Sequence, residues 1–402
     1  MEFPLDFRTA MRQWWNAPPL ADSERRVLSF LPFFPEPDSS RKGESLLVEL
    51  SRHRVLNEFQ VTRTTESITD DLVVLHGYGA GLAFFYRNFD GLTRLPGWRM
   101  HALDLLGYGR SSRPRFKIAA KSKIDAVYAS ENWFVDSLEE WRIKKGIDKF
   151  TLMAHSMGGY IGVAYALRHP ERVKKLILVS PAGVPRDPWV IYADDAAEAL
   201  VATEPGPEGV SIPPPGEGMM PPVAVIDTHT EPGPDGTPPL PRVLKELKRP
   251  MPAWLVFLWE RHVSPFSFVR YTGPMGPQFV SLWTSHRFST LPRDQASALH
   301  DYVLGLFTAR GSGEYAITRL LAPGAYARIA LLDRIKALQI PTLWMYGDND
   351  WMDAAAGVKA AKIMNDNGVR SECVIVSKAG HHLYLDNPDE FNSIVVNELM
   401  HE

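Results

Sequence analysis

One serine stands in a turn that suits a nucleophile. The apolar run Phe150–Met153 leads into Ala154-His155-Ser156-Met157-Gly158-Gly159, and Tyr160–Arg168 then has the pattern of a helix. A strand, a tight turn and a helix are the context of the G-x-S-x-G nucleophile elbow, whose small residues let the backbone turn sharply and expose the hydroxyl. Ala154 stands where that pattern has its first glycine. Ser156 is therefore the candidate nucleophile, with one position of the motif changed.

A candidate base follows a later strand. The run Cys373–Val376 is followed by Ala379-Gly380-His381-His382. A serine hydroxyl attacks only weakly until a base accepts its proton, and imidazole can do so near neutral pH. We prefer His381 because it directly follows the glycine of the strand-end turn. His382 is the alternative, as a neighbour that packs or forms a hydrogen bond.

Candidate acids follow the strand Thr342–Tyr346, so the chain order is Ser, acid, His, as in α/β enzymes of this kind. A carboxylate would fix the tautomer of the imidazole and stabilise its protonated form. Asp350 ranks first and Asp353 second, while Asp348 suits a turn. Because parallel strands build their sites at their carboxyl ends, these groups are expected to meet.

A glycine-rich turn is the candidate oxyanion loop. The run Leu72–Leu75 leads into His76-Gly77-Tyr78-Gly79-Ala80-Gly81, where the backbone can approach a substrate closely. The expected amide donors are those of Tyr78 and Met157. The alternative, a phosphate loop, would need a Gly-Lys-Ser/Thr ending, which this turn lacks.

The elements that position these residues predict an α/β fold. The apolar runs are continuous rather than alternating, as in a mostly parallel sheet flanked by helices on both faces. Roughly 160 residues separate Leu176–Val179 from Thr342–Tyr346, far more than the usual connection. We therefore expect a core of residues 61–182 and 331–402 and a large lid or cap insertion at 183–330. Residues 1–60 are expected to be an N-terminal extension.

The expected lid has two parts. About a third of residues 203–241 are proline, which predicts a flexible Pro/Gly-rich segment. An aromatic part follows, with the run Trp254–Trp259 and then Phe266, Phe268, Tyr271, Phe279 and Trp283. These aromatics either pack the lid onto the core or form an apolar tunnel or membrane-facing lip for acyl chains. Trp14 and Trp15, in a short amphipathic segment, add a candidate membrane contact.

The amino-acid composition limits the classes of partner and the cellular compartments that we expect. The net charge of -3 and pI near 6.5 give no basic field for nucleic acid. One cysteine, Cys373, leaves no disulfide and no metal-ligating pair, so we expect no metal, no cofactor and a reducing, intracellular compartment. No apolar stretch is long enough to span a membrane, so a soluble or peripheral protein is expected. Four arginines near the N-terminus are typical of a mitochondrial transit peptide. Such peptides are poor in acidic residues, however, and four acidic residues lie among these arginines. They are Arg8, Arg12, Arg25 and Arg26, against Glu2, Asp6, Asp22 and Glu24.

These residues resemble the α/β-hydrolase superfamily over about 70–200 and 330–402, with Asp104-Leu105-Leu106-Gly107-Tyr108-Gly109-Arg110-Ser111 matching the loop after its fourth strand. More narrowly, the chain resembles the lipid-acting α/β-hydrolase domain-containing proteins four and five, which include the fungal cardiolipin-specific deacylase. The marks are Gly347–Asp353, with its Trp-Met-Asp ending, and His381–Pro388. In the second, His381, four residues and Asp386 form the HxxxxD pattern that this subfamily shares with glycerolipid acyltransferases.

The resemblance implies a serine hydrolase that cleaves acyl esters of phospholipids, such as cardiolipin, through an acyl-enzyme. It also implies that the acid of some members aligns with Asp353. Some members lack the nucleophile and act as coactivators, whereas Ser156 is present here. The alternatives are a lysophospholipid acyltransferase, a small-ester carboxylesterase and a non-catalytic lipid-surface coactivator. An epoxide hydrolase would need an aspartate in place of Ser156. A mitochondrial or membrane-associated cytoplasmic location is expected.

Overall fold

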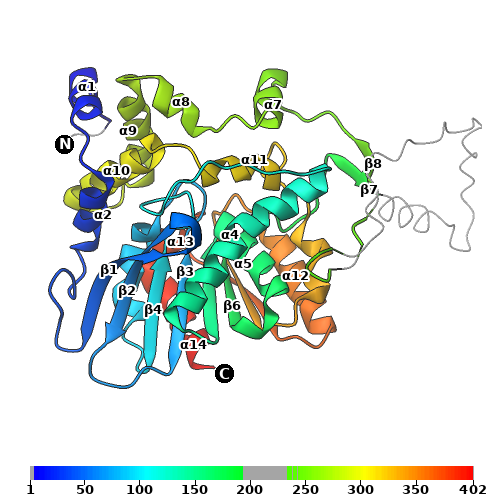
Figure 1. The fold of residues 1–402 in the computed structure, drawn as a ribbon, viewed down its shortest axis with the longest axis horizontal. Helices are drawn as coiled ribbons and strands as arrows, with labels where there is room; N and C mark the ends of the chain where they lie inside the picture. Colours follow the sequence, from blue (N-terminus) through cyan, green and yellow to red (C-terminus); the bar gives the residue numbers. More distant parts are fainter. Residues whose placement is uncertain (1–3, 193–232, 238, 242, 402) are drawn as a thin grey trace, which may run out of the picture.

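The computed structural model describes residues 4–192, 233–237, 239–241 and 243–401, and a large central sheet organises them (Figure 1). Its strands are β1 (Arg41–Glu49), β2 (Val55–Arg63), β3 (Asp70–Leu75), β4 (Trp98–Leu103), β5 (Phe150–His155), β6 (Val173–Val179), β9 (Thr342–Gly347) and β10 (Ser371–Val376). Their order is β1-β2-β4-β3-β5-β6-β9-β10. β2 pairs antiparallel with β1 and β4, and all other neighbours are parallel. The predicted mostly parallel sheet is confirmed.

Helices cover both faces of the sheet (Figure 1). One face carries α4 (Lys123–Lys145), α5 (Met157–Arg168) and α12 (Ala354–Asp366), and the other carries α3 (Tyr86–Leu92), α13 (Leu383–Asp386) and α14 (Pro388–Met400). Residues of β3 alternate between two hydrophobic cores: Val73 and Leu75 belong to the first, Leu72 and Val74 to the second. Because both faces are buried, the strand is apolar at every one of these positions, which explains the continuous runs.

The N-terminal region contributes more to the core than its sequence indicated. β1 and β2 lie within residues 41–63, so the sheet begins before the expected boundary at residue 61. β1 is an edge strand in which Ser45, Leu47 and Glu49 are exposed and the residues between them are only half-buried, and the run contains Lys, Gly and Glu. A half-exposed edge strand needs few apolar residues, which is why the pattern was weak.

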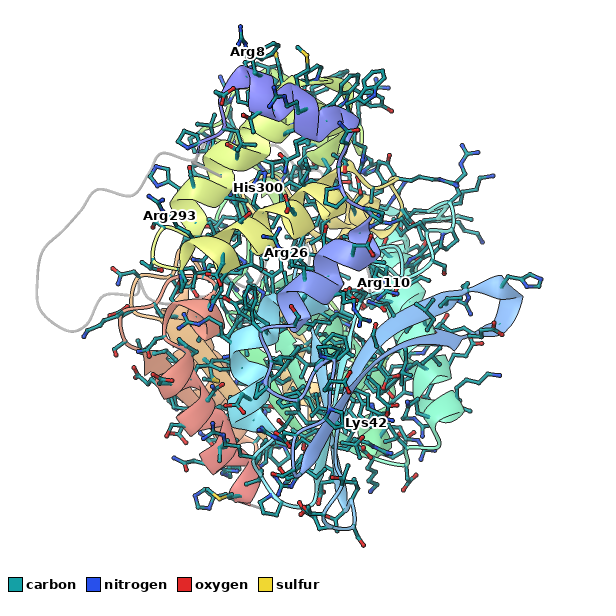
Figure 2. All side chains as sticks on the ribbon, turned by 90° about the vertical axis from the view of Figure 1, so that its left-hand side faces the viewer. Arg8, Arg26, Lys42, Arg110, Arg293 and His300 are labelled. Carbon is teal, nitrogen blue, oxygen red and sulfur yellow. The ribbon has the colours of Figure 1, made fainter. Side chains whose placement is uncertain are left out.

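Two helices precede β1, namely α1 (Phe7–Trp15) and α2 (Leu20–Leu28). Gln13 of α1 donates a hydrogen bond to Asp301 and accepts one from His300, both on α10 (Arg293–Thr308). Arg26 of α2 forms an ion pair with Asp301 at 2.7 Å. Figure 2 shows Arg26 and His300 on these adjoining helices. Both N-terminal helices are thus held against α10.

The segment between β6 and β9 forms the lid region. Its described elements are β7 (Val190–Tyr192), β8 (Val243–Glu246), α7 (Ala253–Glu260), α8 (Phe266–Tyr271), α9 (Met275–Arg287), α10 and α11 (Ile317–Leu320). α7, α8 and α9 lie along the same edge of the molecule as α1 (Figure 1). Most of the predicted Pro/Gly-rich segment 203–241 lies outside the described residues. No helix in the described part of the chain is long and apolar enough to cross a membrane.

Candidate active site

Ser156 occupies the sharp turn between β5 and α5. Its backbone has φ 54° and ψ -120°, a conformation that L-residues rarely adopt. The turn needs small neighbours: a Cβ on Gly158 would collide with the carbonyl oxygen of His76. Ala154 is tolerated because Gly162 faces it from α5, where an added Cβ would come within 3.3 Å of the Ala154 methyl. The changed position of the elbow motif therefore has a compensating glycine in the second turn of α5.

The structure brings His381 to Ser156. His381 Nε2 lies 3.0 Å from Ser156 Oγ. His155 fixes the base from below, since its Nε2 donates a hydrogen bond to the His381 carbonyl oxygen at 2.9 Å. His382, the alternative base, instead accepts a hydrogen bond from Arg287 Nε through its own Nδ1, at 3.0 Å. Burial, then the charge of Arg287, holds the pKa of His382 well below its usual value, so this ring is a neutral acceptor.

The three candidate acids take different roles. Asp350 Oδ1 lies 3.3 Å from His381 Nδ1. Burial would raise the pKa of Asp350, but hydrogen bonds from His381, Ser180 and the Met352 amide outweigh it and lower the pKa. Asp353 is the N-cap of α12, where its Oδ1 accepts the Ala356 amide at 3.1 Å. Asp350 is therefore the carboxylate that meets the base.

The third candidate, Asp348, holds the turn that carries the base. Its two carboxylate oxygens accept the amides of Lys378 and Ala379 at 2.8 and 2.9 Å. These bonds join the loop after β9 to the loop after β10, and they leave Asp348 in the turn role that its sequence context indicated.

One polar residue at the centre of the site was not predicted. Ser180 follows β6 directly, and its Oγ lies 2.7 Å from His381 Nδ1, closer than Asp350 does. Its side chain is fully buried. The available signal was its position, since Ser180 is the first polar residue after the predicted strand Leu176–Val179 and so lies at the carboxyl edge of the sheet.

The two backbone amides expected to form the oxyanion hole belong to residues next to the nucleophile in the chain or in space. Met157 is the first residue of α5, so its amide has no partner within the helix. Tyr78 follows Gly77, where a Cβ would come within 2.9 Å of the Ser156 Cβ. Across the described residues, neither amide donates a hydrogen bond. Both amides are therefore available as donors, and their role in an oxyanion hole stays a prediction.

A buried polar network holds the end of the glycine-rich oxyanion loop, residues 76–81. Asp104 accepts the Leu82 amide at 2.8 Å on one oxygen and the Arg110 amide at 2.8 Å on the other. Asn57 donates to both Asp104 and Glu24, at 2.8 and 2.9 Å. Burial and then the charge of Asp104 raise the pKa of Glu24 to about 8, even though Arg110 pairs with it at 2.7 Å. Glu24 belongs to α2, so the N-terminal region takes part in the network that holds the residues after the oxyanion loop.

The HxxxxD residues do not pair with each other. Asp386 Oδ2 accepts the Gly380 amide at 3.0 Å, and Asp386 Oδ1 pairs with Arg287 of α9 at 2.8 Å. His381, by contrast, points its two ring nitrogens at Ser156 and at the Asp350 and Ser180 pair. Asp386 thus fastens the base loop to the lid instead of acting on the imidazole.

The lid rests directly on the oxyanion loop. The ring of Tyr78 stacks on Phe266 of α8 with centroids 4.9 Å apart, and Phe266 stacks on Phe307 of α10 at 4.5 Å. Aromatic packing of this kind is the first of the two roles expected of the lid aromatics.

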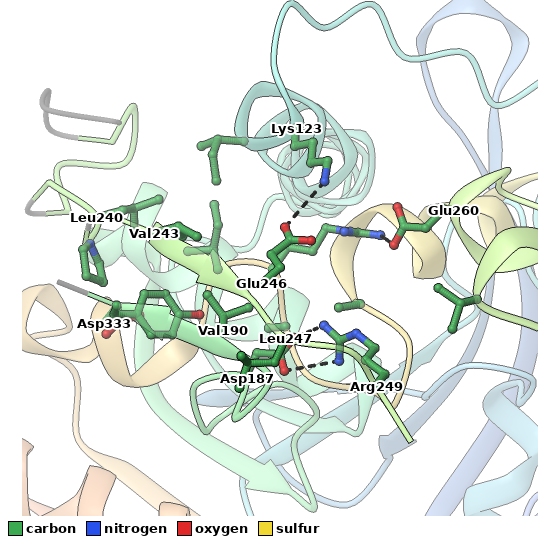
Figure 3. Close-up of a pocket in the computed structure, with 18 of the residues that line it drawn as sticks. Lys123, Asp187, Val190, Leu240, Val243, Glu246, Leu247, Arg249, Glu260 and Asp333 are labelled. Carbon is green, nitrogen blue, oxygen red and sulfur yellow. Dashed lines mark hydrogen bonds and ion pairs between the residues drawn. The ribbon is translucent and has the colours of Figure 1, made fainter. Parts of the chain in front are cut away.

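Helix α7 divides its apolar residues between two environments. Ala253 and Val256 line a cavity of about 860 Å³ beside the β7–β8 hairpin and the start of α4 (Figure 3). Among the described residues that line it, none belongs to the group around Ser156. Trp254 and Phe257 instead face outward, 65% and 57% exposed. Of the roles considered for these two aromatics, their exposure fits a membrane-facing lip.

Comparisons with known proteins agree with the fold. A family model described as the alpha/beta hydrolase fold matches residues 72–205. Carboxylesterase CesB of Bacillus subtilis shares the fold, with a TM-score of 0.53 and 18% identity over 94% of this chain and 96% of that one.

Three relatives are named for lipid chemistry. The 1-acylglycerol-3-phosphate O-acyltransferase of Arabidopsis thaliana is 34% identical over 81% of this chain and 65% of its own length, so this chain spans less than two thirds of that relative. The 1-acylglycerol-3-phosphate O-acyltransferase ABHD5 of Homo sapiens is 28% identical over 94% of this chain and 88% of its own. The (lyso)-N-acylphosphatidylethanolamine lipase of Mus musculus is 29% identical over 81% and 77%. The chain therefore belongs to the α/β-hydrolase family and, within it, to the lipid-acting ABHD subfamily.

Proposed function

We propose that this chain is a serine hydrolase that cleaves acyl esters of phospholipids through an acyl-enzyme. The observation that carries the proposal is the 3.0 Å contact between Ser156 Oγ and His381 Nε2, with Asp350 at the other ring nitrogen. Nucleophile, base and acid thus stand in the order and geometry that acyl transfer to serine needs.

The mechanism follows from these contacts. As Ser156 Oγ attacks the ester carbonyl, its proton passes to His381 Nε2, while Asp350 stabilises the imidazolium that forms. The carbonyl oxygen gains negative charge and is met by the free amides of Tyr78 and Met157. His381 then protonates the leaving alcohol, which leaves the acyl group on Ser156. A water molecule, deprotonated by the same imidazole, releases the fatty acid.

Exposed apolar side chains support a lipid-surface substrate. The helices α1, α7, α8 and α9 lie along one edge of the molecule (Figure 1). Their exposed large apolar residues are Phe7, Met11, Trp14, Trp15, Trp254, Phe257, Leu258, Phe268, Tyr271, Met275, Leu282 and Trp283, here called the lid face. Aromatic residues in such a concentration favour the boundary between headgroups and acyl chains. The lid face would therefore place the site against a lipid surface.

Acyl transfer is the second candidate function. The same acyl-enzyme could be attacked by the hydroxyl of a lysophospholipid in place of water, and the acyltransferase names of the Arabidopsis and human relatives favour this route. Incubation with a labelled phospholipid and an excess of lysophosphatidic acid separates the two: release of fatty acid means hydrolysis, and label in the acceptor means transfer. Cardiolipin as substrate and a mitochondrial location stay predictions.

The test of the proposed function is labelling with a fluorophosphonate probe, paired with turnover of phospholipid. Wild type should be labelled and Ser156→Ala should not, with turnover lowered by about a million-fold and the melting temperature unchanged. Labelling without phospholipid turnover, but with turnover of butyrate esters, would favour a small-ester carboxylesterase. A wild type without Ser156-dependent labelling would favour a non-catalytic lipid-surface coactivator and overturn the proposal.

A further inference from the structure

Ser180 stands at the ring nitrogen that the acid of a triad usually has to itself. Its Oγ lies 2.7 Å from His381 Nδ1, against 3.3 Å for Asp350 Oδ1. The backbone of Ser180 is fixed to the neighbouring strand, because its amide donates a hydrogen bond to the Met345 carbonyl oxygen at 2.7 Å. Its side chain is fully buried.

The backbone of Ser180 adds to this picture. Its φ is 45°, in the left-handed region that a residue with a Cβ seldom occupies. Such a conformation persists only where its surroundings impose it, and it is concentrated at functional sites. Here the turn after β6 aims the Ser180 side chain back at His381.

The number of hydrogens that each group carries determines which group donates and which accepts in each hydrogen bond. In the mechanism above, His381 Nε2 accepts the proton of Ser156, so Nδ1 carries the hydrogen of the resting imidazole. Ser180 Oγ must therefore accept from Nδ1, which leaves its own hydrogen for another group. Asp350 Oδ2 is buried and accepts no hydrogen bond among the described residues. The nearby Ser180 hydroxyl contributes, after His381, to lowering the pKa of Asp350 against the opposing effect of burial.

We propose that Ser180 is a positioning residue of the catalytic site: it accepts the His381 Nδ1 hydrogen and donates its own to Asp350, so that imidazole and carboxylate are linked through its hydroxyl as well as directly. This inference rests on the proposed function. During the attack on the ester, the proton of Ser156 moves to His381 Nε2, and the Nδ1 hydrogen stays on the ring. Ser180 fixes the tautomer and stabilises the imidazolium, and no proton leaves through it.

The experiment compares Ser180→Ala with wild type, using butyrate ester turnover and the rate of fluorophosphonate labelling, each followed across pH. Loss of one hydrogen-bond partner of the base should lower kcat about 10- to 100-fold with little change in KM. The acid limb of the pH profile should move to lower pH, because the protonated imidazole loses a stabilising acceptor. A purely structural role would lower activity without moving that limb.

Three further variants guard the interpretation. Ser180→Gly also removes the hydroxyl but relieves the left-handed backbone, so it serves if Ser180→Ala folds poorly, and the two should behave alike. Ser130→Ala removes another fully buried hydroxyl, one that is bonded to the Ala126 carbonyl oxygen on α4, and should keep wild-type kinetics. In an Asp350→Asn background, Ser180→Ala should cost much less than it does alone, because both residues act on His381.

The outcomes separate this inference from the proposed function. Unchanged rates and pH profiles in both Ser180 variants, with wild type labelled at Ser156, would overturn the role of Ser180 and leave the hydrolase intact. A wild type that is not labelled would overturn the proposed function and this inference with it.

Discussion

Asp350 and His381 meet at 3.3 Å between Oδ1 and Nδ1, on the side of the ring that faces away from Ser156. Asp353, three residues on, turns its carboxylate to the Ala356 amide and begins α12. Asparagine at 350 should therefore cost up to about ten-thousand-fold in kcat, because an amide can hold the imidazole in the wrong tautomer. Asparagine at 353 should keep the rate, since asparagine is also a good N-cap.

Turnover of a butyrate ester by Asp350→Asn and Asp353→Asn measures the difference. Asp353→Ala adds a check on the capping role, as it should lower the free energy of unfolding by about 1 kcal/mol. If Asp353→Asn proved the more damaging of the two asparagine variants, the acid would be the residue that the family resemblance suggested for some members.

Local sequence carried much of the site. Ser156, His381 and Asp350 each lie within a few residues of the end of an apolar run, so a strand-end argument brings them to one edge of the sheet. The choice between Asp350 and Asp353 could not be made in this way. It depends on a helix start three residues away, which sets one carboxylate toward the base and the other toward a backbone amide.

The residues that sequence missed depend on contacts between distant segments. Ser180 reaches His381 across 201 positions, and Glu24 reaches Arg110 across 86. Nothing in the neighbourhood of either residue encodes its partner. The edge strand β1 was missed for a different reason, because a half-exposed strand lacks the continuous apolar run of the central strands.

Asp386 and Arg287 should act together on the base loop. Asp386 holds the Gly380 amide and the lid residue Arg287, so Asp386→Asn and Arg287→Gln should each let the loop shift. Loss of one charge-assisted bond corresponds to about a 10- to 100-fold fall in rate. Because the loop carries the base for both reactions, hydrolysis and transfer to lysophosphatidic acid should fall by the same factor.

The control for this pair is Lys362→Gln, which breaks the exposed Lys362–Asp366 ion pair and should leave both rates unchanged. A variant of Asp386 that lost transfer and kept hydrolysis would show that His381 and Asp386 form a separate acyltransferase unit.

Glu24 should make stability depend on pH. In the folded protein the Glu24 carboxyl keeps its proton up to about pH 8, whereas its ordinary pKa, as in the unfolded chain, is 4.5. Between these values the folded state binds more protons than the unfolded state. The free energy of unfolding should therefore fall as pH rises through this window, by a few kcal/mol in all, and level off above it.

Thermal unfolding of wild type and Glu24→Gln from pH 5 to 9 checks this expectation. The variant has no proton to lose at this position, so its advantage over wild type should grow with pH. Glu36→Gln, at an exposed position, should follow wild type throughout. Parallel curves for wild type and Glu24→Gln would mean that Glu24 is already ionised at pH 5.

The lid face should bind lipid surfaces through its aromatic residues. Trp14 and Trp15 of α1 are 44% and 77% exposed, and Trp254 and Phe257 of α7 are 65% and 57% exposed. The two helices lie along the same edge of the molecule (Figure 1). Replacing either pair by alanine removes two apolar side chains whose transfer from water is favourable by about 1.5 to 3 kcal/mol each when complete. The affinity for phosphatidylcholine vesicles should then fall at least tenfold, as measured by the recovery of protein with the vesicles in a flotation gradient. Ile143→Ala, which removes an exposed apolar side chain from the last turn of α4, is the matched control and should float like wild type.

Activity distinguishes docking from catalysis on the same variants. The lid face is proposed to bind the lipid and does not include Ser156, so turnover of oleate esters in vesicles should fall with binding, while turnover of dissolved butyrate esters should stay at the wild-type value. Equal losses on the two substrates would mean that these aromatics hold the lid together, because a displaced lid would disturb the stack of Phe266 on Tyr78 and with it the oxyanion loop. If the two aromatic variants floated as well as Ile143→Ala, the lid face would not be the lipid contact. Any lipid-binding surface would then lie elsewhere on the described part of the chain.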